Sequence, residues 1–267
     1  AESIALHDCD ILTYHRSLLA RLLYPVANPR FQYEFCKGFY PRFARGKLNG
    51  RVSRLFVTPV LRSLKQVCGS SDYLEFMDSF RYPLAGEFSF RRDVMVDLRI
   101  PGDWGLEIGV LSEMHRNYAH NRLCQVDIAD AYDHKHQDVS HDDADKGLSK
   151  MSVDISKALF RKLATNGVVF SKGTFRTIKA SYYRIALDLI DAYRSDSLIN
   201  GLDLDIHEEE NSVELFANNI MEAGKYFLDN PMETPFIPCW NRVISAIPDI
   251  LPRLKEAVEL DNEEFSE

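Results

Sequence analysis

The pattern of apolar residues changes near residue 143. Before this point, short apolar runs typical of strands, such as Ser3–Leu6 and Leu123–Ile128, alternate with helical patterns. After it, helical spacing dominates in long stretches: Asp145–Ala164, Thr174–Tyr193, Ser212–Leu228 and Trp240–Leu260. A mixed pattern followed by an all-helical one predicts an α/β portion, residues 1–142, followed by a helical extension, residues 143–267.

Within the α/β portion, the same spacing rules predict a series of further elements. The predicted helices are Tyr14–Tyr24, ended by Pro25, and then Arg51–Val67, Asp72–Phe80 and Leu106–Tyr118. The predicted strands are Phe31–Tyr40 and Glu87–Phe90, and a helix is expected after the latter.

Composition and charge narrow the possible functions. With 267 residues and 45% hydrophobic content, the chain can bury a sizeable core. Its net charge of −8 argues against a non-specific nucleic-acid binder. Residues 30–65 are nevertheless basic, with Glu34 as the one acidic residue. A local basic stretch in an acidic chain suits a small anionic ligand, although a solvated face is the plainer interpretation.

The cysteines and the hydropathy indicate a cytoplasmic protein. Five cysteines are scattered without a CxxC pair, which is typical of reduced, mostly buried thiols. The sequence holds neither an apolar run of about 18 residues nor a signal peptide. No membrane span is therefore expected.

Asp8 and Asp10 flank one residue directly after the predicted strand Ser3–Leu6. Successive residues of a strand face opposite ways, and Asp8 and Asp10 are two residues apart. Where the strand ends the chain turns, so both carboxylates can reach one ion. Hard oxygen ligands suit Mg²⁺ or Mn²⁺ better than Zn²⁺. The pair is a candidate metal site, with a solvated turn as the alternative.

His134 and His136 follow the predicted strand Leu123–Ile128. A histidine can complete an octahedral site that two carboxylates begin, whereas the alternative is a polar loop.

Gly50, Arg51 and Ser53 stand at the start of a predicted helix. Backbone N–H groups, a guanidinium and a hydroxyl together form an anion site, although an ordinary helix N-terminus has the same composition.

Two glycine-containing segments complete the set of candidates. Gly86 precedes a predicted strand and permits close approach of a ligand to the backbone, and Gly105 does the same beside Trp104. Glu107 lies in the first turn of a predicted helix, where the helix dipole favours a carboxylate. The alternatives are turn glycines, a core tryptophan and a stabilising helix-start glutamate.

These motifs occur in one order: D-x-D, G-R-V-S, P-L-A-G-E, W-G-L-E and D-H-K-H. With this order the chain resembles the glucosyl-3-phosphoglycerate synthases and the related mannosyl-3-phosphoglycerate synthases, retaining glycosyltransferases of the Rossmann-like GT-A fold. The resemblance covers roughly residues 3–140. It implies that residues 1–142 are the acceptor- and metal-binding, C-terminal portion of a GT-A catalytic domain, and that 143–267 are a helical extension.

The resemblance also implies roles for single residues on the donor side. Asp8 and Asp10 would hold the Mg²⁺ or Mn²⁺ that bridges the diphosphate of a nucleotide-sugar, with Asp10 the more direct ligand. His134 would be the remaining protein ligand. The donor sugar would be lined by Leu84, Ala85, Gly86 and Glu87.

On the acceptor side, Arg51 and Ser53 match the pair that holds the phosphate of 3-phosphoglycerate, and Gly50 precedes them. Trp104 takes an aromatic position beside the acceptor. Glu107 matches the glutamate near the reacting hydroxyls, with a positioning role expected rather than a nucleophilic one. His136 falls where the family often has an acceptor-binding asparagine.

The reaction implied is transfer of glucose, or mannose, from a nucleotide-sugar, UDP-glucose first, to 3-phosphoglycerate. Relatives carry about half of the nucleotide-binding subdomain before D-x-D, and this chain is expected to lack it and to be inactive alone. The alternatives left open are a non-catalytic GT-A-like module that drives oligomerisation and, last, a phosphate-dependent metallohydrolase. A homodimer without nucleic acid or membrane is the expected assembly.

Overall fold

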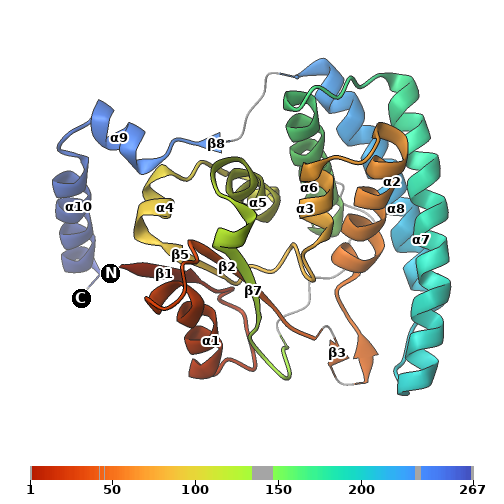
Figure 1. Ribbon diagram of the computed structural model, residues 1–267, viewed down its shortest axis with the longest axis horizontal. Coiled ribbons are helices and arrows are strands. Elements are labelled where there is room, and N and C mark those ends of the chain that lie inside the picture. The colour runs from red at the N-terminus through yellow and green to blue at the C-terminus, as the bar shows by residue number, and fades with distance from the viewer. Residues whose placement is uncertain (1, 42, 45, 134–146, 232–235, 266–267) are drawn as a thin grey trace.

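The computed structural model describes the chain except for residues 1, 42, 45, 134–146, 232–235 and 266–267. A mixed sheet lies in the middle, with α7 (Lys172–Asn200) and α8 (Ile206–Asp229) at one end of the molecule. The last two helices, α9 (Trp240–Ala246) and α10 (Ile250–Glu264), lie at the other end (Figure 1). The expected order of an α/β portion followed by helices is confirmed.

The main sheet has four strands in the order β1-β5-β2-β7. These are β1 (Ser3–Leu6), β2 (Phe35–Phe39), β5 (Phe88–Arg91) and β7 (Leu123–Asp127). β5 runs antiparallel to both of its neighbours, whereas β2 and β7 are parallel. Two small ribbons pair β3 (Phe43–Ala44) with β4 (Lys47–Leu48) and β6 (Ile100–Pro101) with β8 (Phe236–Ile237).

The alternation of side chains along the strands separates two cores. Phe35 of β2 faces the larger core, and Cys36 faces a smaller one under α1 (Arg16–Ala27). On β5, Phe88 and Phe90 face the larger core, while the Ser89 hydroxyl donates to the Leu22 carbonyl of α1 at 2.7 Å. This register places α1 on one face of the sheet.

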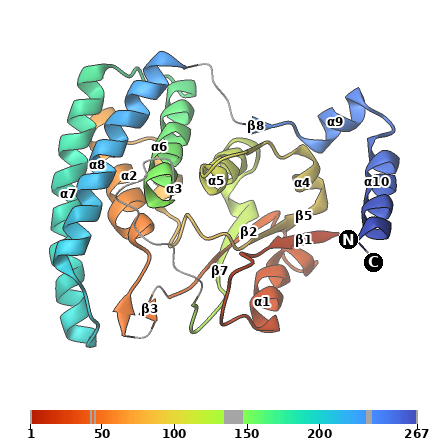
Figure 2. The ribbon, with the colours of Figure 1, turned by 180° about the vertical axis from the view of Figure 1, so that it is seen from behind.

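On the side of the sheet away from α1, α4 (Arg92–Asp97) and α5 (Leu106–Asn117) lie beside the strands, as Figure 2 shows from behind. Farther along, η1 (Val52–Val57), α2 (Thr58–Cys68) and α3 (Asp72–Asp78) lie next to the long helices. A short 3₁₀ turn, η2 (His120–Arg122), leads into β7. The predicted helix Arg51–Val67 is therefore interrupted at its start by the π-helical turn η1, a geometry often found at functional sites.

The three long helices share the larger core with the sheet. The hydroxyl of buried Tyr182 on α7 donates to the Leu55 carbonyl of η1 at 2.7 Å. Asn219 on α8 donates to the Ser152 hydroxyl of α6 (Gly147–Thr165) at 2.8 Å. A Cβ on Gly224 would lie 2.6 Å from the Phe175 ring, so glycine permits the close packing of α8 on α7.

Several predicted helix boundaries were wrong, and two of these differences involve prolines. Pro25 does not end α1, which runs to Ala27; near a C-terminus proline removes one backbone bond, and Asn28 N–H still donates to the Tyr24 carbonyl at 3.1 Å. The predicted helix Trp240–Leu260 is two helices, because Pro248 disfavours the helical conformation at Ile247.

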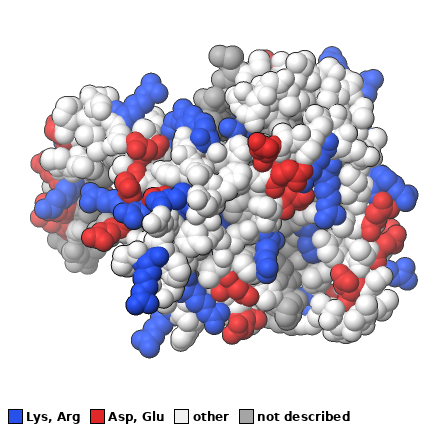
Figure 3. Space-filling view, in the orientation of Figure 1, with Lys and Arg blue, Asp and Glu red and all other residues white. Residues whose placement is uncertain are grey.

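Charges on the face drawn in Figure 3 are mixed, with Lys and Arg interspersed among Asp and Glu. Among the described residues, no helix combines the length and the apolar character that crossing a membrane requires.

Candidate metal and anion site

Asp8 follows the end of β1 and lies against Gly86, the residue before Glu87 and β5. A Cβ on Gly86 would overlap the Asp8 carboxylate, so glycine is required for this approach. Part of Asp8 stays exposed, yet desolvation and the nearby carboxylates Glu87, Glu107 and Asp10 raise its pKa to about 6. Asp8 of the predicted metal pair therefore lies against Gly86 and Glu87 of the predicted donor segment.

Asp8, Asp10, Glu87 and Glu107 together are called the acidic cluster below. Glu87 is its fully buried member. Its Oε1 accepts the Tyr132 hydroxyl at 2.5 Å and the Asp8 backbone N–H at 3.4 Å. Its Oε2 has no hydrogen-bond partner among the described residues. Gly38 permits strand β2 to pass close by, since a Cβ there would lie 3.0 Å from the Glu87 carbonyl oxygen.

Lys37 of β2 supplies the cation that faces these carboxylates. It is buried, and its Nζ donates to the Ala85 carbonyl at 2.5 Å, which ties the L-A-G-E segment to the sheet. Burial lowers the pKa of Lys37 to about 8, against the raising effect of Glu107, Glu87 and Asp8. Sequence reasoning placed Lys37 only in the basic stretch; a lysine between Cys36 and Gly38 in an apolar strand was the available signal.

Glu107 lies in the first turn of α5, as predicted, and Trp104 precedes it with 40% of its surface exposed. Burial raises the pKa of Glu107, and Lys37 opposes that rise. Leu84 packs against the larger core, whereas Ala85 belongs to the smaller one.

A metal ion at this place would be held by Asp8 and Asp10, whose carboxylate oxygens suit a hard divalent cation. The predicted third ligand, His134, lies outside the described residues, as does His136. Within the described part of the chain, no cluster of three or more His, Cys, Asp or Glu side chains is arranged as a metal site. The chemistry of the two carboxylates fits such an ion.

His7 was not singled out from the sequence. Both of its ring nitrogens are buried and lack a partner among the described residues, and its ring meets Tyr14 edge to face. Desolvation lowers its pKa, against the field of Glu87.

A second polar centre forms around the π-helical turn η1. A cavity of about 150 Å³ is lined by Phe39, Tyr40, Gly50, Ser53, Arg54, Thr58, Arg81, Tyr82, Pro83 and Tyr193. Gly50 has a φ of 78°, a conformation that favours glycine, and it turns the chain into η1. The buried Ser53 hydroxyl has no hydrogen-bond partner among the described residues. Two of the three predicted anion-binding residues, Gly50 and Ser53, therefore line one cavity.

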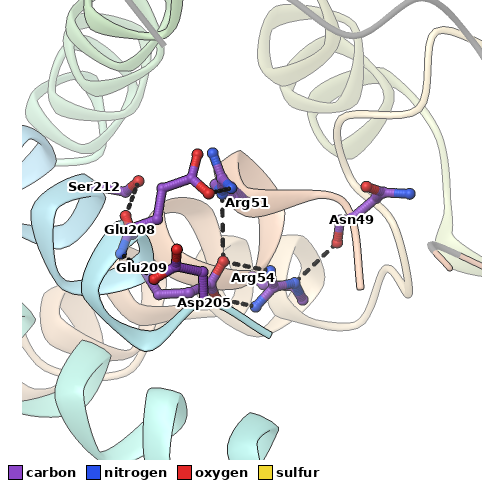
Figure 4. A network of polar contacts seen from close by, with 7 residues as sticks. All are labelled: Asn49, Arg51, Arg54, Asp205, Glu208, Glu209 and Ser212. Atoms are coloured by element: carbon purple, nitrogen blue, oxygen red, sulfur yellow. Dashed lines mark hydrogen bonds and ion pairs between the residues drawn. The ribbon is translucent and has the colours of Figure 1, made fainter. Parts of the chain in front are cut away.

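Arg54 and Glu209 form a buried ion pair behind this cavity (Figure 4). The contact is bidentate: Nη1 donates to Oε2 at 2.8 Å and Nη2 to Oε1 at 3.0 Å. Arg54 Nε also donates to the Asn49 carbonyl at 2.9 Å, and the guanidinium lies 4.7 Å from the Tyr193 ring centroid. Sequence reasoning missed this pair, because its partners are far apart in the chain.

Arg51 is not among the residues that line the cavity. Its Nη2 lies 2.6 Å from Glu208 Oε2, and its Nε lies 3.3 Å from Glu209 Oε1. Both glutamates belong to the first turn of α8. The helical extension therefore reaches the residues that the sequence assigned to acceptor phosphate.

Two tyrosines connect the acidic cluster and the cavity. Tyr40, in the cavity wall, stacks on Tyr132 with ring centroids 3.6 Å apart and planes 9° apart. Tyr132 in turn donates to Glu87, beside Asp8. The acidic cluster and the cavity are therefore neighbours.

Comparisons with known proteins found no matching family model, but they did find similar curated enzymes. A glucosyl-3-phosphoglycerate synthase from Persephonella marina is 47% identical over 262 residues, which are 98% of this chain and 64% of the relative. Another from Methanococcoides burtonii is 40% identical over 269 residues, 99% of this chain and 65% of the relative. The chain is thus similar to these enzymes along nearly all its length, which confirms the resemblance.

The chain spans just under two thirds of the length of these curated relatives. Among solved structures, a glucosyl-3-phosphoglycerate synthase from Mycobacterium tuberculosis, in complex with Mn²⁺, UDP and phosphoglyceric acid, superposes with a TM-score of 0.49 at 22% identity. The superposition covers 64% of this chain and 51% of that one.

Proposed function

We propose that this chain carries the metal- and acceptor-binding part of a retaining GT-A glycosyltransferase that moves glucose from UDP-glucose to 3-phosphoglycerate. The observation that carries the proposal is its similarity to glucosyl-3-phosphoglycerate synthases over 98% of its length. The neighbouring acidic cluster and anion cavity support it, because the reaction brings a nucleoside diphosphate and a phosphorylated acceptor together. Both named relatives favour glucose over mannose.

The proposed roles are those that the resemblance implies. Asp8 and Asp10, with His134, would hold Mg²⁺ or Mn²⁺, which when bound neutralises charge on the leaving diphosphate. The backbone at Gly50 and the side chains of Arg51 and Ser53 would bind the acceptor phosphate and so orient the attacking hydroxyl.

The remaining residues shape the sugar site. Leu84, Ala85, Gly86 and Glu87 would line the donor sugar, and Lys37 holds that segment in place through the Ala85 carbonyl. Glu107, Trp104 and His136 would position the acceptor. Retention follows from attack on the same face that the diphosphate leaves, with the hydroxyl proton passing to the leaving phosphate oxygen.

The direct test supplies UDP-glucose, Mg²⁺ or Mn²⁺ and 3-phosphoglycerate to a protein that contains this chain, and detects glucosyl-3-phosphoglycerate by mass spectrometry. Asp10→Ala should abolish turnover, whereas Asp130→Ala, at a side chain 94% exposed, should leave it unchanged. No turnover with any nucleotide-sugar and either metal would overturn the proposal.

The competing proposal is a non-catalytic module whose helices drive assembly. The exposed apolar residues of α10 favour it: Leu251, Leu254, Val258 and Leu260. The non-catalytic module would be supported if the chain bound neither Mn²⁺ nor 3-phosphoglycerate and sedimented as a tight dimer. The main proposal also includes homodimerisation, a cytoplasmic location and the absence of nucleic-acid and membrane partners. Sedimentation of the purified chain tests homodimerisation.

A further inference from the structure

The first turn of α8 carries two glutamates toward η1 (Figure 4). Asp205 caps this helix, since its Oδ1 accepts the Glu208 backbone N–H at 3.1 Å. The cap holds the turn so that Glu208 and Glu209 both face the arginines of η1 and its flank. Two cations and two carboxylates therefore form one compact, charge-balanced network.

The two glutamates play unequal parts in this network. Glu209 is buried, and both of its oxygens are engaged by Arg54. Glu208 keeps 45% of its side chain exposed and makes one ion pair with Arg51. Removing Glu209 would leave a buried cation without its partner, whereas Glu208 can move into solvent at the cost of one partly exposed ion pair.

The guanidinium groups of Arg51 and Arg54 differ in how freely they can bind an anion at the neighbouring cavity. Arg54 lines the cavity, but its guanidinium is held by Glu209 and the Asn49 carbonyl. Arg51 lies outside the cavity wall, and its Nε also contacts Glu209 Oε1 at 3.3 Å. It is nevertheless the exchangeable cation, because its shorter contact, at 2.6 Å, is with the half-exposed Glu208. The buried Ser53 hydroxyl in the cavity wall has no partner in the described part of the chain, and an incoming anion would satisfy it.

We propose that Glu208 is a built-in competitor for the acceptor phosphate: it occupies Arg51 in the empty site, and a phosphate group binds by displacing it. Glu208 then determines how strongly the site selects doubly charged phosphate groups over singly charged carboxylates, because only the former outmatch the resident carboxylate on Arg51. This inference rests on the proposed acceptor role of Arg51. Glu209 acts as a positioning residue that fixes Arg54 beside it.

The test measures binding of inorganic phosphate and of 3-phosphoglycerate to the 267-residue chain by isothermal titration calorimetry. Glu208→Gln should bind both about fivefold more tightly, because a competing ion pair worth about 1 kcal/mol is removed. Glu210→Gln is the matched control: Glu210 is exposed in the same helical turn and should change affinity little. Circular dichroism verifies that each variant is folded.

Arg51→Ala should abolish most phosphate binding, and adding Glu208→Gln to it should then give no gain. The proposal is overturned if Glu208→Gln leaves affinity unchanged or weakens it, if Glu210→Gln gives an equal gain, or if the gain persists without Arg51. Absence of phosphate binding in both the wild type and Glu208→Gln also overturns it. A gain specific to Glu208 without any glucosyl transfer would count against the proposed enzyme alone.

Discussion

At the scale of single residues, the acidic cluster depends on the absence of a side chain at Gly86. Gly86 lets the Asp8 carboxylate lie against the backbone of the segment that leads to Glu87, and any Cβ would occupy the same space. The cluster concentrates carboxylates next to one buried lysine, Lys37. Desolvation, followed by this concentration of carboxylates, disfavours the ionised form and raises the pKa of Asp8 to about 6.

Replacing Gly86 with alanine should weaken divalent metal binding about tenfold or more, because Asp8 must leave its position. Titration of Mn²⁺, followed by electron paramagnetic resonance, measures the loss. Gly173→Ala is the control, because the nearest atom to its added Cβ is the Ser171 hydroxyl oxygen, at an ordinary 3.5 Å. Wild-type metal affinity in Gly86→Ala would show that Asp8 is not a ligand.

Lys37 should give the protein a stability that rises with pH. Its pKa falls from 10.5 to about 8 on folding, so between these values the unfolded chain binds more protons than the folded one. The free energy of unfolding therefore increases from pH 8 to pH 10.5, by about 3 kcal/mol at about 1.4 kcal/mol per pKa unit. Below pH 8 the penalty for burying the charged lysine is fully present.

Lys37→Met should lack this contribution. Urea unfolding in the presence of EDTA at several pH values gives the difference between wild type and variant, in which contributions of other groups largely cancel. We expect the free energy of unfolding of the wild type, relative to that of the variant, to increase as pH rises. Parallel curves from pH 8 to pH 10.5 would contradict a depressed pKa at Lys37.

At the scale of elements, the helices are well marked where caps and apolar spacing agree. Ser171 begins α7 with a capping box: its Oγ accepts the Thr174 N–H at 3.1 Å, and the Thr174 hydroxyl accepts the Ser171 N–H at 3.2 Å. The helix ends at Gly201, whose φ is 63°. The start of α8 lay earlier than predicted, although Asp205 followed by Glu208 is an N-cap signal.

Ser171→Ala should lower the free energy of unfolding by about 1 kcal/mol, because it removes the cap of the longest helix. Urea denaturation followed by circular dichroism measures this change. Ser195→Ala, inside the same helix and exposed, should not destabilise the protein, because alanine favours helix. Equal losses in the two variants would mean that the cap contributes nothing special.

At the scale of the whole molecule, the α/β portion and the helices are packed around one shared core. Residues of η1, α2 and β2 join residues of α6, α7 and α8 in the larger hydrophobic cluster. The Arg54–Glu209 pair adds a polar connection between the two portions. The boundary at 142/143 remains a prediction, and we expect both portions to unfold in one transition.

Glu209→Ala should lower the free energy of unfolding by about 3–5 kcal/mol, because it leaves the Arg54 charge buried without its partner. Glu210→Ala, on the exposed side of the same turn, should change it by less than about 0.5 kcal/mol. Tryptophan fluorescence and circular dichroism report the unfolding. A mild effect at Glu209 would mean that water reaches Arg54 readily.

The sequence by itself was enough for the strand Ser3–Leu6, the D-x-D pair at its end and Glu107 in the first turn of its helix. It was also enough for the presence of long helices after residue 143, but not for all of their ends. These features depend on local periodicity and on residue chemistry over a few positions. Only the tertiary structure decided that Lys37 faces the carboxylates and that Glu209 holds Arg54, 155 residues away. Such pairs depend on which helix packs where, and packing is set by many weak contacts that no short stretch encodes.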